Sequence, residues 1–534
     1  MIKDRDALAS RRATVAALLR VVALVLSCLL LSACQAPLRP DFQRLYGTAV
    51  ASSDDTPVIL IPGLFGSKLR DRITGEEVWP GHAGRVLFSN FHDLALDFDP
   101  RTLAVRQDRL VAYDLADSVL GRDFYGPILR TLVEFGGYVR AEPGTAARPG
   151  QRRLYLFAYD WRQDNVEHAR GLEVLIDQIR ADYRDPTLRV DIVAHSMGGL
   201  IARYYLRYGT RDVLDGMPSL ISLYGAQRVR KLVLLGTPNF GAVSAVHGYL
   251  EGQRIGLRNM PPEVLATMPS GYQLFPHPLA PWVVDGDGRP LPDNLFEAET
   301  WQRYGWNVYD PRVAARVTLA HGGDQANLDA LRRFFAFRLE RARRLAWMLS
   351  TPEPATPIRY VLFGGDCTLT PARIAIERQA GVPRAVLAPR KLGQGATHAA
   401  LEHVMLEPGD GRVTRPSLLA RQTLDPSAPQ HEQSFLPLAY HFFLCERHDR
   451  LTSNVSFQDN LLNVLLSPHL PGEVPAAGEP QVEASGPGGS IREPACSMEQ
   501  VVYNQGTQAA RAVAGPYSRQ CVRQEGVASR EPLR

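Results

Sequence analysis

The stretch Ala194-His195-Ser196-Met197-Gly198 decides the fold of this chain of 534 residues. It follows the apolar run 190–193, which is typical of a buried strand, and it precedes residues 199–206, whose pattern predicts a helix. A strand that turns directly into a helix needs small residues two positions before and two positions after the residue at its tip. Gly198 and Ala194 meet this requirement. We therefore expect Ser196 to lie at the tip of a sharp turn, with its hydroxyl raised above the edge of a sheet.

Other runs of strand length surround this turn. They occupy residues 57–61, 153–159, 229–235, 358–363 and 435–445, and helical periodicity covers residues 125–136, 166–182, 327–349 and 459–466. Strands that alternate with helices predict a mostly parallel sheet covered on both faces. A serine at a strand–turn–helix junction of such a sheet is the nucleophile elbow of the α/β-hydrolases. The sequence therefore predicts the α/β-hydrolase fold.

Composition divides the chain into four parts. We expect a signal segment over residues 1–33, a tether over 34–56, the α/β-hydrolase domain over 57–470, and a tail over 471–534. The tail is rich in Pro, Gly, Ala and Glu, and we expect it to be disordered. Two insertions, at about 66–150 and 240–355, break the strand–helix rhythm of the domain. We expect them to cap the serine at the carboxyl ends of the strands, where α/β sheets bind ligands.

The N-terminus has the features of an export signal. A basic region precedes the apolar run 21–31, which ends in Leu31-Ser32-Ala33-Cys34. This ending resembles the lipobox of bacterial lipoproteins, and the resemblance implies cleavage before Cys34 and a lipid on its sulfur. The lipid would anchor the exported protein to a membrane, and Gln35 is typical of sorting to the outer membrane in such lipoproteins. The alternative is a plain secretory signal in which Cys34 is incidental.

Composition also limits the cofactors and partners. The net charge is +4 and no basic block lies outside the N-terminus, so nothing indicates binding of nucleic acid. No Cys/His spacing resembles a zinc site, and acyl transfer through a serine needs neither a metal nor an organic cofactor. Export would place the cysteines in an oxidising compartment. Four cysteines follow Cys34 in the sequence, and they can pair in three ways. We expect Cys367 to pair with Cys445 and Cys496 with Cys521.

A serine nucleophile requires a base and an acid, and in this fold the acid and then the histidine follow the serine along the chain. His448, just after the last predicted strand, is the expected base. His403 and His441 lie in apolar runs that we interpret as strands. Asp366 and Asp410 both follow apolar runs and have a glycine neighbour. The residues alone favour Asp410 only slightly as the acid.

The serine also requires donors for the oxyanion that forms on the substrate carbonyl. One is expected to be the backbone N–H of Met197, directly after the serine. The other should come from the loop after the first strand, where Pro62-Gly63 permits a close approach of the backbone to a substrate. We expect the N–H of Leu64 to be this second donor.

Five segments, in order, resemble the lecithin:cholesterol acyltransferase family, which includes phospholipases and phospholipid:diacylglycerol acyltransferases. They are residues 57–69 (PVILIPGLFGSKL), 159–162 (YDWR), 194–199 (AHSMGG), 236–242 (GTPNFGA) and the Gly-Asp-Gly turn at Asp410, and His448 with its helix closes the set. The resemblance implies Asp410 as the acid and Leu64 as an oxyanion donor. Thr414 stands where the family often has proline, and the cysteine-bridged lid of the mammalian members is missing. We interpret Asp160 and Arg162 as a buried ion pair that shapes the pocket.

These features lead to one hypothesis and two alternatives. The hypothesis is a membrane-tethered serine esterase or O-acyltransferase that acts on lipid acyl esters, as a lipase or phospholipase does, with Ser196, His448 and Asp410 as its catalytic residues. One alternative is a hydrolase of a non-lipid ester. The other is a non-catalytic surface lipoprotein that uses the fold for binding. Hydrolysis and acyl transfer both stay open, because they differ in how well the acyl-enzyme excludes water.

Overall fold

The computed structural model describes Arg20 and residues 40–468, except 53, 120–121, 217–219, 352–353, 355, 380–381, 390–396 and 421–435. The chain divides into two units, Met1–Pro475 and Ala476–Arg534, and all described residues belong to the first. The expected signal segment, the lipid-bearing Cys34, the tail and the pair Cys496–Cys521 lie outside the described residues. The cysteine pair Cys367–Cys445 lies within them and forms a disulfide, as predicted.

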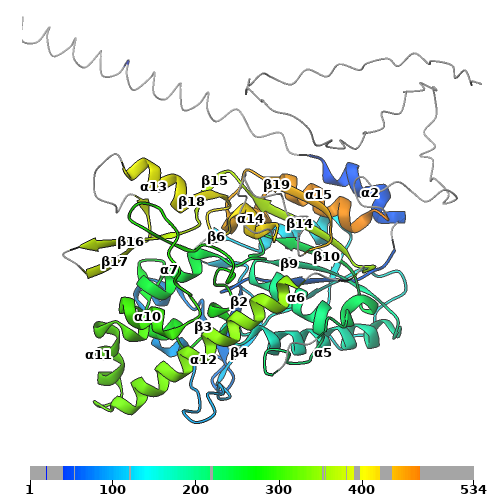
Figure 1. Ribbon diagram of the computed structural model, residues 1–534. Helices are drawn as coiled ribbons and strands as arrows, with labels where there is room; N and C mark the ends of the chain where they lie inside the picture. The colour runs from blue at the N-terminus through cyan, green and yellow to red at the C-terminus, as the bar shows by residue number, and fades with distance from the viewer. Residues whose placement is uncertain are drawn as a thin grey trace, which may run out of the picture. The chain divides into compact units, whose positions relative to one another are not determined.

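A parallel sheet forms the centre of the described part of the chain (Figure 1). Among the described residues it has seven strands in the order β19-β14-β10-β9-β1-β8-β7, and every neighbouring pair is parallel. The strands are β1 (Val58–Ile61), β7 (Val139–Arg140), β8 (Arg153–Leu156), β9 (Val190–His195), β10 (Val229–Leu235), β14 (Arg359–Gly365) and β19 (Leu438–Leu444). The α/β-hydrolase fold is confirmed, and the short edge strand β7 is an addition to the predicted strands.

Both faces of this sheet are buried, because successive side chains of a strand point to opposite faces. Ile59 and Ile61 of β1 belong to one core, with helices α5 (Asn165–Tyr183) and α6 (Met197–Tyr208). Val58 and Leu60 belong to the other core. That second core is covered by α2 (Phe42–Ser52), α4 (Gly126–Arg130) with the π-helical turn η2 (Thr131–Phe135), and α15 (Val455–Leu466). In Figure 1, α5 and α6 lie across the sheet from α2 and α15.

Residues 42–52 of the expected tether form helix α2, which packs on the domain. Its Phe42 is buried against Phe135, with ring centroids 5.3 Å apart, and the Tyr46 hydroxyl donates to the Asp459 carboxylate of α15 at 2.7 Å. From Phe42 onward the segment is therefore a packed part of the domain. Apolar residues at positions 42, 46, 49 and 50 carry the helical spacing that indicates such a face.

The first predicted insertion carries a small antiparallel sheet of its own. Its strands are β2 (Ser67–Asp71), β3 (Glu77–Trp79) and β4 (Leu110–Leu115), with α3 (Ala83–Phe88), η1 (His92–Leu94) and the hairpin β5 (Ser118–Val119)–β6 (Arg122–Asp123). It contacts the second insertion directly. Phe98 stacks on Phe334 with ring centroids 4.3 Å apart, and the Leu96 amide donates to the Thr267 hydroxyl at 2.9 Å.

The second predicted insertion is mostly helical. It contains α7 (Val243–Glu251), the hairpin β11 (Gln253–Ile255)–β12 (Arg258–Met260), α8 (Pro262–Leu265), α9 (Pro269–Tyr272), β13 (Val283–Asp285), α10 (Ala298–Tyr304), η4 (Asn307–Tyr309), α11 (Pro311–Ala320) and α12 (Gln325–Ser350), and the turn η3 (Tyr224–Gln227) precedes it. The hydroxyl of Ser270, on α9, donates to the Trp161 carbonyl in the loop that follows β8. This insertion therefore contacts the carboxyl end of a central strand.

A third insertion, between β14 and β19, was not predicted. It contains β15 (Thr368–Pro371), β16 (Ile374–Gln379), β17 (Val382–Val386), α13 (Thr397–Met405), β18 (Leu406–Gly409) and α14 (Arg415–Leu418). His403 lies on α13, so its assignment to a strand was wrong. The apolar residues there pack on one side of a helix, with Leu401 and Met405 in a small core against β13, β16 and β17. His441 lies on β19, as expected.

Candidate active site

Ser196 joins β9 to α6 in a strained conformation. Its backbone has φ 52° and ψ −122°, a region that side-chain-bearing residues rarely occupy. The loop after β1 approaches this turn closely. A Cβ atom added to Gly198 would lie 2.5 Å from the Pro62 carbonyl oxygen, and one added to Gly63 would lie 2.7 Å from the Ser196 Cβ. The tight approach explains why small residues flank the serine.

The structure brings together the three side chains that the sequence singled out. The Oγ atom of Ser196 lies 3.0 Å from Nε2 of His448, and Nδ1 of His448 lies 2.7 Å from Oδ2 of Asp410. His448 opens the 3-10 turn η6 (His448–Ser453), directly after β19. The Asp410 carboxylate accepts a hydrogen bond from the N–H group at Nδ1, so Nε2 carries no proton and accepts a hydrogen bond from the serine hydroxyl. This tautomer is inferred from the hydrogen bonds.

The Asp410 carboxylate is fixed on both sides. Its Oδ1 atom accepts hydrogen bonds from the backbone amides of Arg412 at 2.9 Å and Val413 at 2.7 Å. The backbone carbonyl of Asp410 accepts a hydrogen bond from the backbone amide of His448 at 2.8 Å, and only 1% of Asp410 is exposed. These bonds leave Oδ2 directed at the histidine ring. Burial with complete hydrogen bonding holds the carboxylate in one orientation.

Asp366, the competing acid, lies elsewhere. Its carboxylate forms an ion pair with Arg415 at 3.2 Å, near the surface. The adjacent Cys367 is bound to Cys445, which follows β19 and lies three residues before His448. This disulfide links the ends of β14 and β19. It thereby restrains the loop that carries His448.

The loop after β1 has two backbone donors without a protein partner among the described residues, the amides of Leu64 and Phe65. The Pro62 carbonyl accepts from the Tyr159 hydroxyl at 2.8 Å, the Gly63 carbonyl from the Gly66 amide at 3.0 Å, and the Phe65 carbonyl from the Trp79 indole at 2.9 Å. Within the described part of the chain, the Leu64 amide donates to no protein acceptor.

The second expected oxyanion donor, the Met197 amide, is also without a protein partner in the described part of the chain. Met197 is the first residue of α6, where backbone N–H groups have no partner within the helix. Among the described residues its amide also has no protein acceptor. Met197 follows Ser196 directly, and Gly63, the neighbour of Leu64, lies against the Ser196 side chain, so both amides belong to segments that flank the serine.

Two side chains near the serine, the buried Tyr125 and the half-buried His195, were missed by the sequence analysis. The Tyr125 hydroxyl accepts from the Gly63 amide at 2.8 Å and lies 2.9 Å from Nδ1 of His195. Burial, together with the neighbouring His448, lowers the pKa of His195 to about 3, so this imidazole is neutral. The position of His195 directly before the serine is a local signal. Tyr125 has none, because 70 residues separate it from its partner.

Asp160 and Arg162 form the predicted ion pair. Two guanidinium nitrogens of Arg162 donate to the two carboxylate oxygens of Asp160, each at 2.8 Å, and the guanidinium also pairs with Asp108. Another nitrogen donates to the Leu94 carbonyl at 3.3 Å, and the Arg162 side chain is fully buried. Arg162 therefore binds the first insertion to the end of β8.

A small apolar cavity of about 40 Å³ adjoins the Leu64 loop. Leu64 and Phe65 form one wall, and residues of α7, α8 and α9 with their connections form the rest; among them are Ala245, Gly248, Tyr249, Leu265, Met268 and Leu274. Few polar atoms face this space. Ser196 itself does not line this space, which adjoins the loop that packs against the serine.

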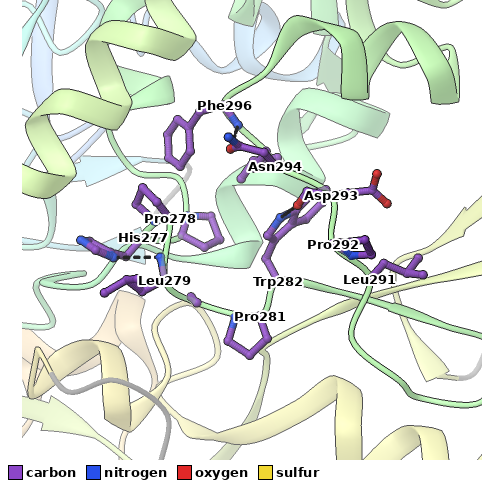
Figure 2. Close-up of a pocket in the computed structure, with 13 residues that line it drawn as sticks. His277, Pro278, Leu279, Pro281, Trp282, Leu291, Pro292, Asp293, Asn294 and Phe296 are labelled. Carbon is purple, nitrogen blue, oxygen red and sulfur yellow. Dashed lines mark hydrogen bonds between the residues drawn. The ribbon is translucent and has the colours of Figure 1, made fainter.

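A larger cavity of about 360 Å³ lies between the loops 276–282 and 291–296 (Figure 2). None of the predicted site residues lines it. Its polar side chains are already bound: Nδ1 of His277 accepts from the Leu279 amide at 3.1 Å, and the Trp282 indole donates to the Asp293 carbonyl at 2.9 Å. The Asn294 oxygen accepts from the Phe296 amide at 3.0 Å. The polar side chains of this cavity are therefore not available to bind a ligand. We place the site at Ser196, where the three predicted side chains are hydrogen-bonded to one another.

The described residues contain no group of three or more His, Cys, Asp or Glu side chains arranged to hold a metal ion. No helix in the described ranges is long and apolar enough to cross a bilayer.

The model of the lecithin:cholesterol acyltransferase family matches residues 147–288. The chain is similar to this family over that segment, which contains the YDWR, AHSMGG and GTPNFGA motifs, and the predicted resemblance is confirmed there. The segment 57–69, Asp410 and His448 lie outside the matched residues. A comparison with curated proteins gave no match.

Several solved structures are similar to the chain. The structure of the Tle4–Tli4 complex has 15% sequence identity and a TM-score of 0.48, covering 77% of this chain and 98% of that chain. The mature lipase BlEst2 of Bacillus licheniformis has 11% identity and a TM-score of 0.30, covering 78% and 93%. The Staphylococcus hyicus lipase has 13% identity and a TM-score of 0.29, covering 80% and 96%.

Proposed function

We propose that this α/β-hydrolase, similar to the lecithin:cholesterol acyltransferase family over residues 147–288, cleaves lipid acyl esters through an acyl-enzyme on Ser196. The observation that carries the proposal is the continuous hydrogen-bonded series from Ser196 to His448 to Asp410, at 3.0 and 2.7 Å. A serine, an imidazole and a buried carboxylate in this order are the groups that acyl transfer requires.

The reaction follows from this geometry. The Ser196 oxygen attacks the ester carbonyl while Nε2 of His448 takes its proton, and Asp410 stabilises the imidazolium that forms. The amides of Leu64 and Met197 donate to the oxyanion of the tetrahedral intermediate. His448 then returns the proton to the leaving alcohol, and the ester bond breaks to give the acyl-enzyme. Water or a second alcohol removes the acyl group by the reverse sequence.

The apolar cavity beside Leu64 supports a lipid acyl chain as the substrate group. The cavity adjoins Leu64, whose amide we propose as a donor to the ester oxygen, and its lining is almost entirely apolar. Each buried methylene contributes about 0.8 kcal/mol. A long-chain ester should therefore be preferred to an acetyl ester.

The test compares the full-length protein with its Ser196→Ala variant on vesicles of phosphatidylcholine and triacylglycerol. The vesicles carry a labelled acyl chain and either a sterol or diacylglycerol as acceptor, and the products are separated by chromatography. Labelled free fatty acid alone identifies a hydrolase, and labelled sterol ester or new triacylglycerol identifies an acyltransferase. Both products must disappear in Ser196→Ala. Turnover of acetyl esters without any lipid turnover would contradict the proposal and favour a non-lipid ester.

We further propose that the protein is an exported lipoprotein, anchored to the outer membrane through Cys34. The support is the Leu-Ser-Ala-Cys sequence after a basic and apolar N-terminus. The Cys34→Ala variant should lose labelling by a radioactive fatty acid and leave the membrane fraction. Labelling that persists in this variant would contradict the proposal.

A further inference from the structure

The loop that carries Leu64 is held by a relay of two side chains. We infer that Tyr125 and His195 are positioning residues that orient the Leu64 amide toward the oxyanion. The inference rests on the proposed function, because an oxyanion forms only if Ser196 attacks a carbonyl. Neither residue belongs to the series Ser196–His448–Asp410, and neither would touch the substrate.

The direction of the relay follows from its hydrogen bonds. The Tyr125 oxygen accepts the Gly63 amide proton at 2.8 Å, so its own proton is free to be donated. Its other partner is Nδ1 of His195 at 2.9 Å, and we assign this nitrogen as the unprotonated acceptor of the tyrosine proton. In this tautomer the imidazole proton is on Nε2, which is buried and has no protein acceptor among the described residues. The low pKa of His195, about 3, keeps the imidazole neutral.

The position of the relay gives it a role in orienting the loop. The bond to Tyr125 holds the Gly63 amide, and the carbonyls on both sides of this amide are held by Tyr159 and Gly66. Because the Gly63 amide and the two carbonyls are all hydrogen-bonded, the peptide group between Gly63 and Leu64 keeps one orientation. The N–H of this peptide group is the Leu64 amide. A shift of this peptide would move the donor away from the oxyanion while the series at Ser196 stays intact.

His195 also couples the loop to the elbow. It is the last residue of β9, directly before Ser196, and its ring centroid lies 5.0 Å from that of His448. An acceptor on β9 therefore sets the loop after β1 relative to the nucleophile. A neutral ring at this place also adds no charge beside His448 when that residue becomes an imidazolium.

The inference predicts a defect confined to the transition state. Tyr125→Phe removes the acceptor of the Gly63 amide, and we expect kcat for a soluble p-nitrophenyl ester to fall about 10- to 100-fold, since loss of one oxyanion donor costs about 10²–10³ in kcat. KM should change less than about threefold, because ester binding in the ground state does not use the oxyanion donor.

A matched control separates this role from loss of a buried hydroxyl. Tyr204, on α6, also accepts a backbone amide, that of Val213 at 3.0 Å, and donates to the Arg211 carbonyl at 2.6 Å. It is equally buried. Tyr204→Phe should lower the melting temperature as Tyr125→Phe does and leave kcat within about twofold of the wild type.

His195 supplies a second, independent pair of variants. The oxygen of an asparagine side chain occupies nearly the position of Nδ1, so His195→Asn should keep an acceptor for Tyr125 and retain most activity. His195→Leu offers no acceptor and should match Tyr125→Phe. This pair tests the relay even if Tyr125→Phe does not fold.

The decisive readout is the affinity for a trifluoromethyl ketone, whose adduct with Ser196 carries an oxyanion. Across the wild type and the four variants, the loss of inhibitor affinity should follow the loss of kcat/KM. The inference is wrong if Tyr125→Phe and His195→Leu keep wild-type kcat, or if the inhibitor affinity stays constant while kcat falls. A wild-type protein with no activity on any ester would instead overturn the proposed function.

Discussion

Replacing Asp410 by asparagine is the most informative single change at this site. Its effect follows from the two amides that donate to Oδ1, those of Arg412 at 2.9 Å and Val413 at 2.7 Å. An asparagine at this position must turn its carbonyl oxygen toward these donors. Its NH₂ group then faces Nδ1 of His448, which has to become an acceptor. The histidine proton moves to Nε2, and the ring can no longer take the proton of Ser196.

The magnitude is that of a wrong histidine tautomer in a site that is otherwise unchanged. Such a change lowers kcat about 10⁴-fold, which corresponds to about 5 kcal/mol in the transition state. The size, packing and hydrogen bonds of the side chain are retained, so we expect the melting temperature to shift by only a few degrees.

The assay is hydrolysis of p-nitrophenyl butyrate, with Asp366→Asn as the matched control. Asp366 pairs with Arg415 near the surface, so that variant should keep activity within about twofold. The reasoning is refuted if Asp410→Asn stays within tenfold of the wild type while Ser196→Ala is inactive. A loss of equal size in Asp366→Asn would refute it as well.

Three further predictions concern packing, the disulfide and pH. In Gly198→Ala the new Cβ would lie 2.5 Å from a backbone oxygen, so esterase activity should fall at least tenfold, whereas Gly47→Ala on α2, where a new Cβ meets no atom within 4 Å, should keep it; equal activities would contradict this prediction. Cys367→Ser opens a loop of 78 residues closed by Cys445 and should lower the free energy of unfolding by about 4 kcal/mol in urea denaturation; an unchanged midpoint would contradict it. Burial lowers the pKa of His277 from 6.5 to about 3, so the unfolded state binds protons first as pH falls. The free energy of unfolding should therefore fall as pH falls from about 6.5 toward 4, by about 1.4 kcal/mol per pH unit for each such histidine, and less steeply in His277→Gln; urea denaturation at several pH values measures it.

Much of the central sheet could be predicted from the sequence because its strands are buried on both faces. Mostly apolar runs of this length have few other stable positions in a protein; residues 229–235, with four consecutive apolar residues at 232–235, form β10 with the predicted bounds. The turn at Ser196 could also be predicted from the sequence, because such a tight turn requires small residues at positions 194 and 198. The place of His448 followed from the chain order of the fold.

Other parts depend on contacts that local patterns do not contain. The insertion between β14 and β19 has short strands whose partners are distant in sequence, as in the pairing of β13 with β16. His403 was misplaced because a short apolar run fits either a strand or the end of a helix. The choice between Asp366 and Asp410 was nearly even on the residues alone. Only the folded chain shows which carboxylate reaches His448.

The relay of Tyr125 and His195 was missed for the same reason. A buried tyrosine has no periodicity that distinguishes packing from positioning, and its partners lie far away in the sequence, Gly63 in the loop after β1 and His195 at the end of β9. The helix α2 shows the converse case. Its apolar spacing was present in the sequence, but the segment was read as a tether because it follows the expected signal.

The central claim is that Ser196 is the nucleophile and that His448 and Asp410 activate it. The most direct measurement is the reaction of the full-length protein with a fluorophosphonate, followed by peptide mass spectrometry. The account predicts one adduct, on Ser196, with a labelling rate that falls at least 100-fold in His448→Ala and is unchanged in Asp366→Asn. An adduct on another residue, or labelling of Ser196 at the wild-type rate without His448, would contradict the account.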